Sequence, residues 1–121
     1  MLTAELKEFG FYGDIIDKND AQLRMLSSPY RLTLCLSIGE NEKIGSDYFY
    51  VDVINVAYVK LSKCTIGSKC FIFTDDVDDI DDIEYEIKMF VNSIYGNSWE
   101  DILVQLRRYF DWEYENHQFV E

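Results

Sequence analysis

The sequence predicts an α+β fold: an antiparallel sheet of about four to five strands with two C-terminal helices packed on one face. Several stretches alternate apolar and polar residues, which is typical of strands with one buried face. The stretch from Val77 to Tyr114 instead repeats apolar residues at helical spacing, twice, on either side of a Gly-Asn-Ser-Trp joint. The length of 121 residues suits one core, so a single domain over residues 1–121 is expected.

Two helices are expected in the C-terminal third. The apolar stripe of the first consists of Ile80, Ile83, Ile87, Phe90, Val91 and Ile94, and that of the second of Trp99, Ile102, Leu103, Leu106 and Phe110. Gly96 suits the left-handed residue just past a helix end. Ser98 is a good N-cap, and Asp101 stands in the capping-box position three residues later. Two striped helices joined by so short a turn must pack on a common surface, which the strands provide.

The strands are expected at residues 2–11, 30–38, 47–54, 70–73 and 110–114. The clearest is the second, in which Leu32, Leu34, Leu36 and Ile38 alternate with polar residues. A hairpin loop at 39–46 joins it to the third strand. The short apolar run Cys70–Phe73 is expected to be an inner strand. Short helical pieces are expected near 20–26 and 55–63, with Asn55 as a cap for the latter.

The charge restricts the classes of partner. The net charge is −12, and the sequence pI is about 4.3. This excess of acids argues against nucleic-acid binding, which needs Lys and Arg to neutralise phosphate, and against binding to anionic membrane surfaces. It favours a basic partner, a cation, or simple solubility. No run is long enough to span a membrane, and the N-terminus lacks the pattern of a signal peptide, so a cytoplasmic protein with reduced cysteines is expected.

The segment from Asp75 to Glu86 holds eight acids and no basic residue. One interpretation is a helix start, where the positive end of the helix dipole stabilises acids, with the remainder on a solvated face. A second is a surface that docks on a basic partner by imitating a phosphate backbone. Its expected contact residues are Asp75, Asp76, Asp78, Asp79, Asp81, Asp82 and Glu86. A third is a calcium loop using Asp76, Asp78 and Asp81, but the turn glycine and distal glutamate of an EF-hand are missing, so no metal site is expected.

No catalytic motif accompanies these features. His117 is the only histidine, and the sequence contains no nucleophile elbow, phosphate loop, dinucleotide fingerprint or zinc-protease motif. A non-enzyme without a cofactor is therefore expected. The candidate interface anchors are the aromatic residues Tyr48, Tyr50, Tyr85, Tyr95, Tyr109 and Trp112.

The layout resembles the immunity protein 8 family of bacterial polymorphic toxin systems. The resemblance is carried by Ala4-Glu5-Leu6-Lys7, the strands Leu32–Gly39 and Tyr48–Val53, Gly96-Asn97-Ser98-Trp99 with Glu100, and Phe110-Asp111-Trp112-Glu113. It implies an α+β protein that binds and neutralises a toxin domain, often a nuclease, in the cytoplasm and without catalysis. Within the family pattern, Trp99 and Trp112-Glu113 are structural positions.

The leading hypothesis is thus an immunity protein that masks the basic cleft of a cognate toxin domain with the acids of residues 75–86. The alternative is a small acidic adaptor with another protein partner, and a third class is a calcium-responsive module. Exposed strand edges leave both a monomer and a homodimer open.

Overall fold

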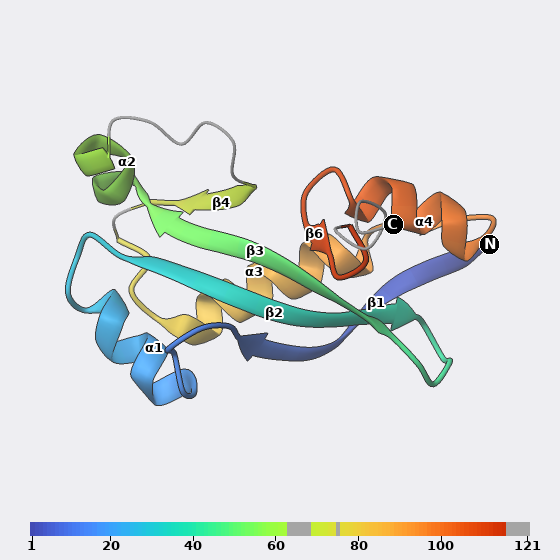
Figure 1. Cartoon of the computed structure of the whole chain (residues 1–121), viewed down its shortest axis with the longest axis horizontal. Coiled ribbons are helices and arrows are strands. Elements are labelled where there is room, and N and C mark those ends of the chain that lie inside the picture. The colour runs from blue at the N-terminus through green and yellow to red at the C-terminus, as the bar shows by residue number, and fades with distance from the viewer. Residues whose placement is uncertain (63–68, 75, 116–121) are drawn as a thin grey trace.

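A computed structural model describes residues 1–62, 69–74 and 76–115 (Figure 1). The elements in chain order are β1 (Leu2–Phe11), α1 (Lys18–Met25), β2 (Arg31–Glu40), β3 (Asp47–Asn55), α2 (Val56–Ser62), β4 (Cys70–Phe73), α3 (Ile80–Asn92), β5 (Tyr95–Gly96), α4 (Trp99–Leu106) and β6 (Asp111–Trp112). The predicted α+β class is confirmed. In Figure 1, α3 lies behind the long strands β2 and β3.

The sheet has the strand order β4-β3-β2-β1-β5, with β6 pairing on β3. The long strands β1, β2 and β3 are antiparallel neighbours, as predicted. The prediction that residues 70–73 form an inner strand is wrong, because β4 lies at the sheet edge. It also runs parallel to β3, so the sheet is mixed. A parallel neighbour needs a crossover connection, and α2 belongs to that connection. Phe71 and Phe73 of β4 pack against the core, and the Phe71 ring contacts those of Phe90 and Phe110.

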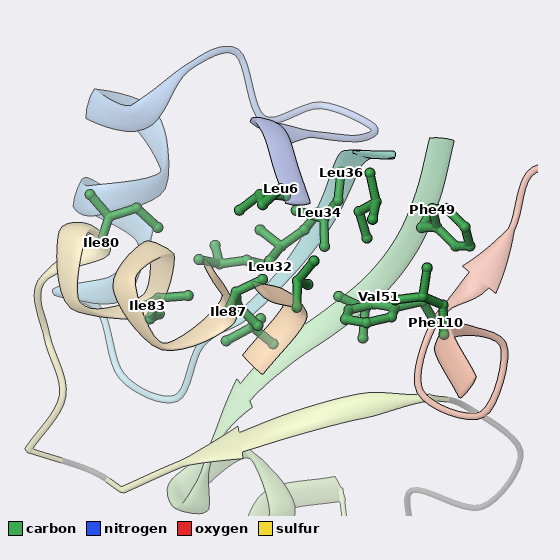
Figure 2. Close-up of a cluster of buried hydrophobic side chains, with 14 of the residues drawn as sticks. Leu6, Leu32, Leu34, Leu36, Phe49, Val51, Ile80, Ile83, Ile87 and Phe110 are labelled. Carbon is green, nitrogen blue, oxygen red and sulfur yellow. The ribbon is translucent and has the colours of Figure 1, made fainter. Parts of the chain in front are cut away.

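The core lies between one face of this sheet and the C-terminal helices. The inward residues of β2 and β3 face one another in register, with Leu32 opposite Val53 and Leu34 opposite Val51. They belong to the same buried cluster as the stripes of α3 and α4. Figure 2 shows Ile83 and Ile87 of α3 pointing toward Leu32 of β2. The predicted packing of the two helices on one face is therefore confirmed.

The joint between α3 and α4 differs from the prediction. Gly96 does not adopt the left-handed conformation of a helix end, because α3 ends earlier and Tyr95–Gly96 form β5 on the edge of β1. Close packing accounts for the glycine: a Cβ at Gly96 would lie 2.6 Å from the Cβ of Asp101. The predicted N-cap is confirmed, since the Ser98 Oγ accepts a hydrogen bond from the Asp101 N–H at 3.3 Å.

Most of the remaining predicted helices and strands are confirmed. The helical pieces near 20–26 and 55–63 are α1 and α2, and the Asn55 side chain caps α2 by accepting from the Tyr58 N–H at 3.1 Å. The predicted last strand is shorter than expected, because only Asp111 and Trp112 pair with β3. Cys35 and Cys70 are free thiols. Cys64 and His117 lie outside the described residues.

Candidate partner-binding surface

The acidic segment leads directly into α3, and Asp79 begins the helix. Its carboxylate accepts a hydrogen bond from the Asp81 N–H at 2.9 Å, which makes it the N-cap. Asp81 and Asp82 stand in the first turn, where the positive end of the helix dipole stabilises them. The helix-start interpretation thus accounts for part of the segment.

Two polar side chains of α1 hold this end of α3 in place. The Gln22 amide donates to the Asp78 carbonyl oxygen at 2.5 Å and accepts from the Ile80 N–H at 2.8 Å. The Lys18 ammonium lies 2.8 Å from an Asp81 carboxylate oxygen and also pairs with Glu84. Both hydrogen bonds, that of Asp81 first, raise the pKa of Lys18. Asp81 and Glu84 are therefore partly neutralised within the molecule.

The outer face of α3 is formed by Asp82, Tyr85, Glu86 and Met89. These residues are three or four positions apart, so they are neighbours on the helix surface. They lie opposite the buried stripe of Ile83 and Ile87. Tyr85 is 59% exposed and Met89 is 54% exposed, so two large side chains with apolar surface lie one helical turn apart on this face. The outer face thus combines an apolar pair with two carboxylates.

The structure divides the seven predicted contact residues into groups. The six that the structure describes are all exposed; among them Asp79 is also the helix cap, and Asp81 pairs with Lys18. Asp76 accepts a hydrogen bond from the Thr74 hydroxyl. Asp75 lies outside the described residues.

A metal site gains no support from this arrangement. Among the described residues, no three His, Cys, Asp or Glu side chains come together as they would around a metal ion. The described part of the chain also contains no helix with the length and apolar composition needed to cross a membrane.

The comparison with known proteins identifies the family. Residues 16–117 match the family model described as Immunity protein 8. The chain belongs to this family. No curated protein and no solved structure matches it.

Membership confirms the resemblance seen in the sequence and implies a toxin protein as the partner of this immunity protein. The family also favours a binding role over a catalytic one. The match covers α3 and its acids, as well as strands β2, β3 and β4, whereas β1 lies before its start.

The predicted aromatic anchors of this immunity protein fall into two sets. Tyr48, Tyr85, Tyr95 and Tyr109 are exposed. Tyr50 and Trp112 are half-buried, and the Trp112 indole donates to an Asp47 carboxylate oxygen at 3.0 Å. The sequence analysis did not include Met89 among the contact residues. Its position three residues after Glu86 and four after Tyr85 would have placed it on the same helix face.

Proposed function

We propose that this immunity protein neutralises its cognate toxin domain by docking the outer face of α3 on a basic surface of the toxin. The observation that carries the proposal is the exposed pair Tyr85 and Met89 beside Asp82 and Glu86. A partly apolar centre with charged neighbours is the usual composition of a protein interface. Aromatic and methionine side chains supply contact area there, and the charges select the partner and speed encounter.

A nuclease is the toxin class that best suits such a surface. An enzyme that cleaves nucleic acid must hold phosphates with Lys and Arg, so its cleft is basic. The acids of residues 75–86 offer the same sign of charge as the phosphate backbone. An immunity protein bound over this cleft excludes the nucleic acid without any chemistry of its own. Both partners would meet in the cytoplasm, where the toxin would otherwise act.

The first experiment measures how a toxin domain encoded beside this protein associates with two variants of equal charge. The test variant is Asp82→Asn with Glu86→Gln. The control is Glu42→Gln with Glu100→Gln, which removes two exposed carboxylates elsewhere on the molecule. We expect the test variant to associate roughly tenfold more slowly at low salt, because steering depends on charge near the contact. The control should stay close to the unchanged protein.

A third variant, Tyr85→Ala, separates contact area from charge. It should dissociate faster while its dependence on salt stays unchanged. Equal association rates for the test and control pairs would reject the outer face of α3 as the contact. A toxin domain that binds none of the proteins, even at low salt, would remove the immunity function for that pair.

A further inference from the structure

The face of the sheet opposite α3 carries a hollow with a volume of about 480 Å³. It lies over β3, between the start of β4 and the short strand β6. The residues that matter for its chemistry are Tyr12, Tyr50, Asp52, Asp111, Glu113 and Glu115. Two tyrosines and four carboxylates thus share one concave site, far from the outer face of α3 in the layering of the fold.

Most of these carboxylates already have partners. Asp52 lies 2.8 Å from the Arg31 guanidinium and accepts from the Thr33 hydroxyl at 2.8 Å. The Glu115 carboxylate accepts from the Arg107 guanidinium at 2.7 Å, and this bond lowers the pKa of Glu115. Asp111 lies 3.6 Å from the ammonium of Lys69, the one basic residue among the described residues that line the hollow.

Glu113 differs from the others. One carboxylate oxygen accepts from the Tyr48 N–H at 2.9 Å, which fixes the side chain against β3. Within residues 1–62, 69–74 and 76–115, no Lys or Arg forms an ion pair with it. Its charge acts on two neighbouring side chains: burial raises the pKa of the Cys35 thiol and of the Tyr50 hydroxyl, and the Glu113 carboxylate raises both further.

The aromatic residues add a second attraction for a cation. The rings of Tyr12 and Tyr50 meet edge to face at 5.1 Å. A tyrosine ring attracts a cation over its face. A guanidinium held by both an aromatic ring and a carboxylate already occurs beside the hollow. The Arg107 guanidinium lies 5.2 Å from the Trp112 ring centre and donates to the Glu115 carboxylate.

We propose that the hollow receives an arginine side chain of the toxin, with the guanidinium on the Glu113 carboxylate and against the tyrosine rings. The identity of the partner rests on the proposed function. Arginine suits the site better than lysine, because its planar guanidinium stacks on aromatic rings and presents several N–H donors to a carboxylate. The hollow is then a second contact, on the other face of the sheet from α3.

The direct test titrates the isotope-labelled full chain with N-acetyl-arginine amide and follows amide chemical shifts. N-acetyl-citrulline amide, similar in shape but uncharged, is the matched control. We expect shifts at Thr33, Tyr50 and Glu113 with a dissociation constant in the millimolar range, and none of comparable size with citrulline. Glu113→Gln should abolish them while keeping the fold, because the amide oxygen still accepts from the Tyr48 N–H. Equal shifts with both probes, shifts confined to α3, or no shift in the hollow would overturn the proposal.

A second measurement separates this inference from the proposed function. Glu113→Gln should weaken the toxin complex roughly tenfold by losing a charge-assisted contact, whereas Asp82→Asn with Glu86→Gln should leave the arginine titration unchanged. A toxin complex that is sensitive to the α3 variant and indifferent to Glu113→Gln overturns the arginine contact and retains the immunity function.

Discussion

Asn55 shows how much one buried polar residue connects. It is 1% exposed at the end of β3. Its side-chain oxygen accepts from the Tyr30 N–H at 3.2 Å and from the Tyr58 N–H at 3.1 Å, and its amide donates to the Ser28 hydroxyl at 3.0 Å. It therefore connects the start of β2 with the start of α2, and it satisfies the buried Tyr30 N–H as well as the half-buried Tyr58 N–H.

Replacing Asn55 by alanine should be strongly destabilising. The substitution removes the side-chain oxygen that accepts from the buried Tyr30 N–H and also removes the cap of α2, and we expect a loss of about 2–4 kcal/mol. Asn41→Ala is the matched control, because Asn41 is exposed in the hairpin and its change should stay within about 0.5 kcal/mol. Urea unfolding measures both. A cost below about 1 kcal/mol for Asn55→Ala would mean that water or a neighbouring residue replaces the lost bonds.

Asn55 also shows which contacts can be predicted from the sequence and which cannot. The cap that Asn55 provides is local and follows from its place before a helical stretch. The bond to Tyr30 joins residues that are 25 positions apart, and no local pattern predicts it. The same holds for Gly96, whose close approach to Asp101 depends on how β5 meets α4.

Among the elements, α1 and α3 are joined by a contact that positions the acidic segment. Gln22 of α1 binds the backbone on both sides of Asp79, at the Asp78 carbonyl and the Ile80 N–H. The first N–H groups of a helix have no partner within the helix, so Gln22 satisfies one of them from outside. This contact fixes the start of α3 relative to α1 and thereby orients the outer face of α3.

Gln22→Ala should loosen the first turn of α3. We expect a loss of about 1–2 kcal/mol and faster hydrogen exchange at the Ile80 amide. Gln22→Glu is the informative second variant: it keeps an acceptor for Ile80, loses the donor to Asp78 and adds a charge beside Asp78 and Asp79. Its defect should shrink as salt rises, whereas that of Gln22→Ala should not. Unchanged Ile80 exchange in both variants would exclude this role for Gln22.

The strands show what periodicity predicts and what it does not. Alternation identified β2 and β3 because each has one buried face. In β1 the apolar positions change from Ala4 and Leu6 to Phe9 and Phe11, and an irregularity in the pairing between Leu6 and Glu8 explains the change. The edge position of β4 was not predictable, because a short apolar run has the same pattern at an edge as in the middle of a sheet.

The candidate site was predictable only in part. The acids of residues 75–86 are visible in the sequence, but their division into a cap, ion-paired residues and an outer face depends on α1 packing against α3. The hollow on the other sheet face was not predicted. Its carboxylates come from β3 and from residues 111–115, which are distant in sequence and meet only because β6 pairs with β3.

For the whole molecule, net charge is the dominant property. The chain has 23 acidic and 11 basic residues. Several of its ion pairs join exposed side chains, including Lys18 with Asp81 and Arg24 with Asp14. Exposed pairs contribute little to stability. We therefore expect repulsion among the remaining carboxylates to outweigh the ion pairs in the isolated protein, most of all in the acidic segment at the start of α3.

Salt should consequently stabilise the free protein and weaken its complex with the toxin. Screening reduces repulsion between carboxylates in the isolated chain. A gain of about 1 kcal/mol corresponds to a rise of roughly 3–6 °C in Tm for a domain of this size. In the complex, screening removes the attraction to a basic partner and slows association. Thermal unfolding of the free protein measures the change in stability, and association kinetics measure the change in binding rate. Both are followed from low to physiological salt.

The variant Asp82→Asn with Glu86→Gln should reduce both salt effects together. The same carboxylates repel one another in the free protein and attract the toxin during binding. A Tm that falls with salt would instead show that the ion pairs outweigh the repulsion between carboxylates.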